Sequence, residues 1–404
     1  MAASHDGTLQ QRSSKLHPSV TVGLDSLLEQ PDLLRGQSIC LVCNQASITS
    51  SLEPCIDAIF NAKRLGLKFV LAPEHGLSGH RQAQEKVDHR RDRRIDVEIQ
   101  SLYGPRLSPD PSLLEKTDAL VFDLQDVGSR YYTYVWTMLH CMYACAEAKV
   151  SMVVLDRPNP LNGATLEGNV LDSRFASFVG MHPVPVRHGM TVAELAGLFN
   201  DQLQVCCDLI AVKMQGWRRG MFFDETGLFW VQPSPNMPTL DTALVYPGMC
   251  LLEGTNISEG RGTTKPFEMF GAPFIDAHSL CERLNDMSLP GARFRPASFS
   301  PTFDKYARKL CHGAQIHVVN RTIFKPYLTG LSIVSAIRQL VPDRFAWRKP
   351  PYEFETQRLP FDVLTGTDSI RLALEAGIPP QQIEADWQNQ LDEFRELRKR
   401  YLLY

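Results

Sequence analysis

Several features that mark common protein classes are missing from this chain of 404 residues. No apolar run approaches the ~20 residues that span a bilayer, and residues 1–16 lack the apolar stretch of a secretory signal. We therefore expect no membrane partner, a disordered arm over residues 1–17 and a cytoplasmic location.

An excess of basic charge is also missing. The 42 Lys and Arg residues face 45 Asp and Glu residues, and the formal net charge is −3. A nucleic-acid partner would require a positive field on the protein surface, so we expect none. The basic run over residues 90–94 is interpreted as a solvated loop.

Signals for metals and nucleotide cofactors are scarce. The ten cysteines show no zinc-like spacing with His, and Cys40, Cys43, Cys141 and Cys145 lie in apolar segments, where buried free thiols are common. There is no Walker loop, no Gly-x-Ser-x-Gly elbow and no Gly-x-Gly-x-x-Gly after the first apolar strand. We expect a reducing compartment, no metal and no cofactor.

Short apolar runs alternate with helical patterns in the first half of the chain. Strands are predicted over residues 38–42, 67–72, 119–124, 152–155 and 209–214, and helices over residues 54–65, 131–149 and 191–202. The last of these helices begins with a Thr-x-x-Glu capping box. This alternation favours an α/β domain built on a mainly parallel sheet that is covered on both faces.

The second half is less regular and predicts a smaller α+β domain. A strand is expected over residues 315–319, and helices over 327–340 and 386–401. We place the boundary near residue 245, which gives domains over residues 18–245 and 246–404.

Polar side chains follow each of the first four predicted strands. Since ligands bind just past the carboxyl ends of parallel strands, these groups are candidates for one site. They are Asn44, Gln45, Glu74, His75, Asp123, Gln125, Asp126 and Asn159. Asp123 and Asp126 bind ligand or tie the strand end to backbone amides, and Asp156 is expected to form a structural ion pair with Arg157.

Glu74 is the carboxylate of greatest interest among these groups. It follows an apolar strand and Pro73, where partial desolvation would raise its pKa and suit a general acid. The alternative is that Glu74 braces the loop. His75 either binds substrate or fixes the turn before Gly76.

Further polar segments could complete a site. His188 precedes a predicted helix N-terminus, which favours anions, and Asn236 is held among prolines. Residues 253–268 combine three carboxylates, an Arg, a Lys and an Asn with three glycines, which is typical of a loop that binds a sugar or an anion. Tyr131 is expected in the core, although an aromatic ring there could stack on a sugar.

Longer motifs run through most of the chain. They include LVCNQ (41–45), APEHGLSG (72–79), SLYG (101–104), VFDLQDVGSRYYTY (121–134), LDRPNP (155–160), HGMTVAEL (188–195), PSPNMPT (233–239) and YPGMCLLEGTNISEGRGTTKPFEMFGAP (246–273). By these motifs the chain resembles the NamZ family of exo-β-N-acetylmuramidases. The resemblance implies a Rossmann-like N-terminal domain, a smaller C-terminal domain and an active site in the cleft between them.

The resemblance also implies an activity, the release of N-acetylmuramic acid from the non-reducing end of peptidoglycan fragments. Glu74 is then the catalytic acid, and Glu259 or Glu253 supplies a second carboxylate unless the substrate's acetamido group assists directly. Asn256 would face Glu74 across the cleft, and Arg261 or Lys265 would pair with the lactyl carboxylate of the sugar. No oligomeric state is predicted.

The chain departs from the family pattern beside Glu74. Ser78 stands where the family usually has Arg, and residues 83–85 and 92–98 also differ. These departures keep one alternative open, a muropeptide or amino-sugar binding protein without turnover. A different α/β enzyme, such as a cofactor-dependent one, is a separate alternative.

Overall fold

The computed structural model describes residues 19–62, 64–82, 90–92, 95–104 and 106–404. The predicted arm over residues 1–17 lies outside these ranges, as do the departures at residues 83–85. Among the described residues, no helix has the length and apolar character needed to cross a membrane.

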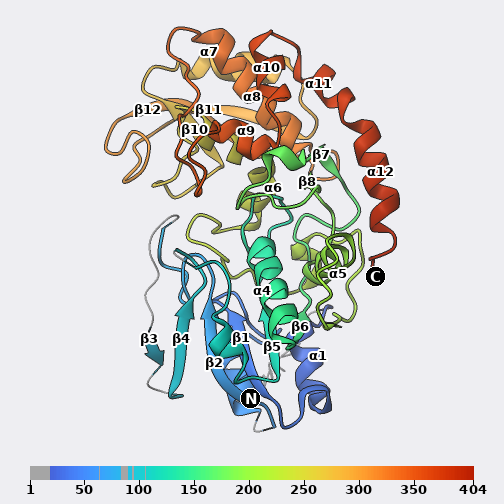
Figure 1. Ribbon diagram of the computed structural model, residues 1–404. Helices are drawn as coiled ribbons and strands as arrows, with labels where there is room; N and C mark the ends of the chain where they lie inside the picture. The colour runs from blue at the N-terminus through green and yellow to red at the C-terminus, as the bar shows by residue number, and fades with distance from the viewer. Residues whose placement is uncertain (1–18, 63, 83–89, 93–94, 105) are drawn as a thin grey trace, which may run out of the picture.

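The N-terminal part is built on a seven-stranded sheet in the order β3-β4-β2-β1-β5-β6-β9 (Figure 1). The strands are β1 (Ser38–Cys43), β2 (Gly66–Ala72), β3 (Arg90–Asp92), β4 (Val97–Ser101), β5 (Ala119–Asp123), β6 (Ser151–Leu155) and β9 (Leu209–Val212). All pairs are parallel except β3 with β4. Counted along the chain, the six parallel strands have the spatial order 3-2-1-4-5-6 of a Rossmann fold.

Helices cover both faces of this sheet, as the apolar strands require. They are α1 (Gly23–Glu29), α2 (Cys55–Asn61), α3 (Pro111–Leu114), α4 (Tyr134–Ala148) and α5 (Val192–Gln202). One hydrophobic cluster contains residues of α3, α4 and α5, and another contains residues of α1 and α2. Cys40 belongs to the first cluster and Cys43 to the second. Although they have a Cys-x-x-Cys spacing, their side chains lie on opposite faces of β1.

The C-terminal part has an antiparallel sheet in the order β10-β12-β11. Its elements are η4 (Cys250–Gly254), β10 (Met269–Ala272), α7 (Ala277–Asp286), β11 (Ala292–Phe299), β12 (Cys311–Val318), α8 (Pro326–Leu340), α9 (Pro360–Thr365), α10 (Ser369–Glu375), α11 (Pro380–Asp386) and α12 (Gln388–Arg398). The predicted α/β class with a mainly parallel sheet and a smaller second part is therefore confirmed.

Helix α6 (Leu240–Met249) joins the two parts and contains the predicted boundary at residue 245. It packs on α8 through two glycines. A Cβ on Gly248 would lie 1.8 Å from the carbonyl oxygen of Pro326, and one on Gly330 would lie 2.2 Å from the carbonyl oxygen of Gly248. The absence of side chains here lets the two helix backbones touch.

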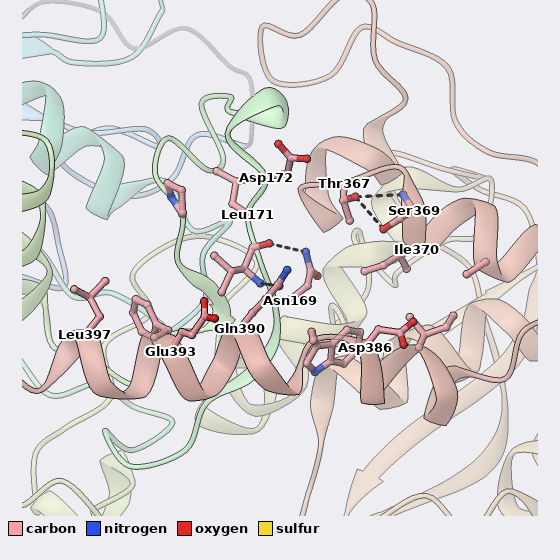
Figure 2. A pocket seen from close by; sticks show the side chains of 16 residues that line it. Asn169, Leu171, Asp172, Thr367, Ser369, Ile370, Asp386, Gln390, Glu393 and Leu397 are labelled. Atoms are coloured by element: carbon pink, nitrogen blue, oxygen red, sulfur yellow. Dashed lines mark hydrogen bonds between the residues drawn. The ribbon is translucent and has the colours of Figure 1, made fainter.

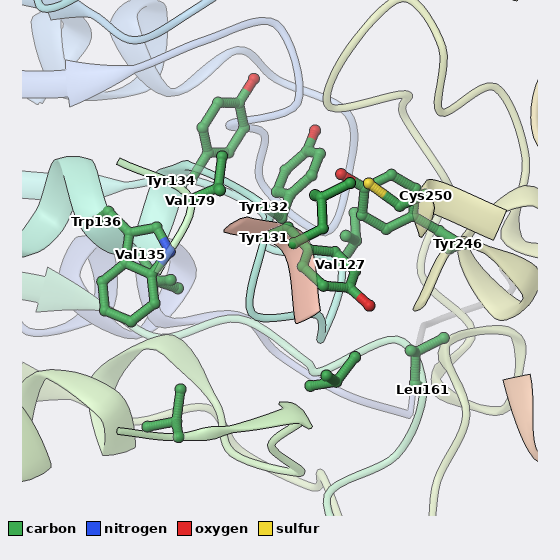
Figure 3. Close-up of a cluster of buried hydrophobic side chains, with 14 of the residues drawn as sticks. Val127, Tyr131, Tyr132, Tyr134, Val135, Trp136, Leu161, Val179, Tyr246 and Cys250 are labelled. Carbon is green, nitrogen blue, oxygen red and sulfur yellow. The ribbon is translucent and has the colours of Figure 1, made fainter. Parts of the chain in front are cut away.

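Aromatic residues extend the N-terminal core to the C-terminal part (Figure 3). Tyr131 and Tyr132 precede α4, and their rings lie 6.1 and 6.0 Å from that of Tyr246 in α6. All three are buried. The segment before α4 is thus fixed against the other half of the molecule.

Two further elements connect the halves. The hairpin of β7 (Glu167–Val170) and β8 (Pro185–Arg187) packs beside α8 and α12. Helix α12 runs from the C-terminal part back to α5, where the chain ends (Figure 1). There the Tyr404 hydroxyl donates to Asp156 at 2.7 Å, beyond the end of β6.

Candidate active site

A pocket lies between the carboxyl end of β2, the start of α4 and the polar loop after α6. Its walls come from both halves of the chain. The lining residues are Glu74, His75, Tyr131, Tyr132, Thr133, Val179, Ser234, Asn236, Met237, Tyr246, Glu253, Arg261, Phe267, Tyr352 and Glu353. Three carboxylates and one guanidinium, far apart in sequence, therefore meet in one small space.

Glu74 stands at the end of β2, where the chain turns sharply. His75 and Gly76 both have positive φ, 71° and 77°, and the His75 ring contacts the carbonyl of Arg81 at 2.9 Å. The carboxyl group of Glu74 is buried and accepts a hydrogen bond of 2.9 Å from the Thr133 hydroxyl, just before α4. The turn thus directs the Glu74 side chain from the sheet edge into the pocket.

Tyr103 connects Glu74 with a second glutamate. Its hydroxyl donates to Glu353 at 3.2 Å, and it also interacts with Glu74. Burial raises the pKa of the Tyr103 phenol, and the charges of the two glutamates raise it further. Tyr103 therefore keeps its proton, donates a hydrogen bond to Glu353 and lies between the two carboxylates.

Glu253 is the carboxylate of the opposite wall. It accepts hydrogen bonds from Arg261 at 2.7 Å and from the Tyr352 hydroxyl at 2.9 Å. Burial by itself would raise the pKa of Glu253, but the Arg261 charge and these hydrogen bonds hold it below its usual value. Glu253 is therefore an anion at neutral pH.

Glu259, the other predicted second carboxylate, does not line the pocket. It is buried behind Arg261, with its oxygens 3.3 Å from Arg261 Nε and 2.8 Å from Lys305 Nζ. Two cations thus hold Glu259 away from the space where a ligand would bind.

The remaining predicted site residues divide into two groups. His75, Tyr131, Asn236 and Arg261 line the pocket, where Tyr131 also donates to the carbonyl of Pro247 and Asn236 donates to Gln82. Nine others lie outside its lining: Asn44, Gln45, Asp123, Gln125, Asp126, Asn159, His188, Asn256 and Lys265.

Most of these nine tie loops together. Amide side chains donate to backbone carbonyls: Asn44 and Gln45 to Pro233, Gln125 to Pro158, Asn159 to Met190, and Asn256 to Arg344. Asp126 accepts from the backbone N–H of Gly128 and lies 3.6 Å from His188 Nε2, while Lys265 pairs with Glu268 at 2.9 Å.

The expected Asp156–Arg157 ion pair is wrong. Arg157 pairs with Asp123 at 2.5 and 2.8 Å, and both side chains are buried. Asp156 instead accepts from Thr191 and from the backbone N–H of Ala193. The Asp123–Arg157 pair lies at the crossing between β1 and β5, where a Rossmann fold commonly binds its ligand. The pocket opens one strand away, after β2.

Sequence reasoning missed Thr133, Tyr103, Tyr352 and Glu353. Tyr103 lies in the SLYG motif, and Tyr352-Glu353 follows two prolines. The short motifs that contain these residues were visible in the sequence. Nothing in their local pattern indicates that they approach Glu74 in the folded chain.

A larger hollow of about 680 Å³ lies between β7, α10 and α12 (Figure 2). Its apolar lining residues include Leu171, Ile370 and Trp387, and its acidic ones include Asp386 and Glu393. The lining residues that the structure describes include no Lys, Arg or His. Without a cation to organise its carboxylates, this hollow is a weaker candidate for catalysis than the pocket around Glu74.

Neither pocket provides a metal centre. Within the part of the chain that the structure describes, no group of three or more His, Cys, Asp or Glu side chains could hold a metal ion.

Comparisons with known proteins identify the family. Residues 39–241 match the family described as exo-beta-N-acetylmuramidase NamZ, N-terminal, and residues 244–404 match its C-terminal counterpart. The chain is also 44% identical to the peptidoglycan beta-N-acetylmuramidase NamZ of Bacillus subtilis (strain 168), over 100% of this chain and 95% of that protein. The chain belongs to the NamZ family.

Solved structures share the NamZ-family fold. A DUF1343 family protein of Bacteroides fragilis NCTC 9343 is 32% identical, with a TM-score of 0.86 over 96% of this chain and 99% of its own. A second such protein from the same strain is 28% identical, with a TM-score of 0.75 over 95% and 99%.

Proposed function

We propose that this NamZ-family chain is an exo-β-N-acetylmuramidase that releases N-acetylmuramic acid from the non-reducing end of peptidoglycan fragments. The observation that carries the proposal is the pocket between the two halves, which is lined by Glu74, by Glu253 and by its partner Arg261. Full-length similarity to a peptidoglycan β-N-acetylmuramidase supports it. The substrate is a small amino-sugar molecule, a disaccharide or muropeptide, and the ten free cysteines support a cytoplasmic enzyme.

Glu74 is proposed as the general acid. A glycosidase acid protonates the leaving oxygen, while a second group, commonly a carboxylate, acts at the anomeric carbon or activates water. Glu74 is buried, fixed by the Thr133 hydroxyl and positioned at the rigid end of a sheet strand. These contacts hold its carboxyl group in one place for proton transfer.

Glu253 is proposed as the second carboxylate. Its lowered pKa keeps it negative, as a group must be when it stabilises an oxocarbenium-like transition state, activates water or attacks the sugar. Among the described residues that line the pocket, Arg261 is the one Lys or Arg. We therefore propose that Arg261 binds the lactyl carboxylate of the sugar in addition to its contact with Glu253. Lys265 is paired with Glu268 outside the lining.

The test is release of N-acetylmuramic acid from a β-linked N-acetylmuramyl–N-acetylglucosamine disaccharide. We expect Glu74→Gln to lower kcat by at least about 100-fold, the contribution of a general acid. Glu167→Gln is a matched control, because Glu167 is equally buried but lies outside the pocket. Full activity of Glu74→Gln would remove Glu74 from the mechanism.

The same assay distinguishes the hydrolase from the alternative, a binding protein without turnover. A wild-type chain that binds the disaccharide tightly, shown by calorimetry, and releases no sugar would be a non-catalytic amino-sugar binding protein. The departures at residues 83–85 that raised this alternative lie outside the described residues.

A further inference from the structure

A two-residue turn beside the pocket has a conformation that its side chains disfavour. Tyr352 and Glu355 exchange two backbone hydrogen bonds of 2.8 Å, which closes a hairpin over Glu353 and Phe354. These two residues have φ values of 43° and 67°. Positive φ at both positions is typical of a type I′ turn, which favours Asn and Gly rather than Glu and Phe. Strained side-chain-bearing residues of this kind cluster at functional sites.

The turn gives its two side chains different environments. Glu353 lines the pocket and accepts a hydrogen bond from Tyr103, while Phe354 is 54% exposed. The Phe354 ring lies 5.6 Å from the Tyr103 ring and 5.4 Å from the Phe178 ring, and both of those residues are buried. Phe354 is thus supported from beneath and open to solvent.

Tyr103 connects this exposed ring with the proposed acid. It interacts with Glu74 through its hydroxyl and with Phe354 through its ring. A glycosidase acid donates its proton on the leaving-group side of the scissile bond. A leaving group that extends from Glu74 toward solvent would therefore pass the Glu353–Phe354 turn, while the terminal sugar occupies the enclosed space near Glu253.

We propose that the Glu353–Phe354 turn forms the leaving-group subsite, with Phe354 as a stacking platform for the released sugar ring and Glu353 as an acceptor for one of its hydroxyls. The C–H face of a pyranose suits a flat apolar ring that keeps one face in solvent. The ligand class is a pyranose, such as an N-acetylamino sugar, on the reducing side of the scissile bond. This inference rests on the proposed function.

The experiment compares two substrates that share the terminal sugar. One is the N-acetylmuramyl–N-acetylglucosamine disaccharide, and the other is N-acetylmuramyl β-fluoride, whose leaving group has no ring. We expect Phe354→Ala to lower kcat/KM for the disaccharide roughly tenfold, the effect of losing one aromatic contact. Turnover of the fluoride should change less than about twofold, and Phe354→Tyr should retain disaccharide activity.

Phe229→Ala is the matched control, because Phe229 has the same 54% exposure and lies outside the lining of the Glu74 pocket. It should leave both substrates unaffected. Equal losses on both substrates for Phe354→Ala, or no loss on either, would overturn the subsite while the activity stands. If the wild type releases sugar from neither substrate, the proposed function fails, and this inference fails with it.

Discussion

At the scale of single residues, the opposite wall of the pocket is a chain of alternating charges. Glu253, Arg261, Glu259 and Lys305 contact one another in that order. The buried carboxylates of Glu253 and Glu259 each have partly buried cations as neighbours, which offset part of their desolvation penalty. Of the four, only Glu253 and Arg261 line the pocket. They are available to a substrate, while Glu259 and Lys305 support them from behind.

This arrangement predicts different effects for the two glutamates. Glu253→Gln should lower kcat by more than about 100-fold, because it removes the carboxylate that we propose as the second catalytic group. Glu259→Gln should chiefly lower stability, by about 3 kcal/mol, because two partly buried cations lose the buried carboxylate that they share. Activity and denaturant unfolding of both variants test this assignment, and the reverse pattern would make Glu259 the catalytic carboxylate.

At the scale of elements, regular hydrophobic patterns predicted the central strands and the main helices well, whereas β3 and β4 at one edge of the sheet were missed. The Thr191–Glu194 capping box at the start of α5 is confirmed, and β1, β2, β5 and β6 end within a residue of their predicted ends. Strand β4 was missed because it lies near the sheet edge and carries charged and polar residues on its exposed side. The basic run over residues 90–94, expected as a loop, begins with edge strand β3.

A buried acid between two elements predicts a pH dependence. Glu167 of β7 accepts from the Leu328 N–H of α8, and burial raises its pKa to about 7 from 4.5. The folded state therefore favours the protonated form. The stability that Glu167 contributes is complete below pH 4.5 and is lost as pH rises through about 7.

Glu167→Gln should remove this loss of stability at high pH. The neutral amide still has a side-chain oxygen that accepts from the Leu328 N–H, but it has no charge that titrates. We expect the variant to be more stable than wild type at pH 8, by up to about 3 kcal/mol, and similar at pH 4.5. Thermal unfolding of both proteins across this range provides the measurement. A constant difference at every pH would contradict the titration of Glu167.

At the scale of the whole molecule, the chain returns to its first half through α12 and the last residues. The Arg398 guanidinium donates to the carbonyl oxygens of Gly163 and Gly189, and the Tyr404 hydroxyl joins Asp156 to the Met214 N–H. This C-terminal strap connects the two halves in addition to α6, the aromatic contacts of Tyr246 and the β7–β8 hairpin. Their relative position, and with it the width of the pocket, is thereby constrained.

Tyr404→Phe should weaken the strap by about 1–2 kcal/mol, since it leaves Asp156 and Met214 with one hydrogen bond fewer in a buried site. Tyr401→Phe is the comparison, because its hydroxyl contacts exposed Asp201, and we expect a change within about 0.5 kcal/mol. Chemical denaturation measures both. Equal effects would show that the last residue does not clamp the halves.

Local pattern and motif were sufficient for the parallel strands β1, β2, β5, β6 and β9, for the main helices and for selecting candidate site residues. Glu74 was marked by its position after an apolar strand, and residues 253–268 by their polar composition. The strand-end rule also selected Asn44, Asp123 and Asn159, whose side chains brace loops in the folded chain. A strand end places a polar group at the sheet edge, but it does not determine whether backbone or ligand satisfies that group.

The sequence by itself thus determined the α/β class, the family resemblance and the principal acid candidate, because periodicity and motifs are local properties. Only the tertiary structure decided that Glu253 enters the pocket while Glu259 remains behind Arg261. It also brought Tyr103 and Glu353 together, although 250 positions separate them. Such contacts depend on how the two halves pack, and that packing results from buried surfaces across the whole chain rather than from any one segment.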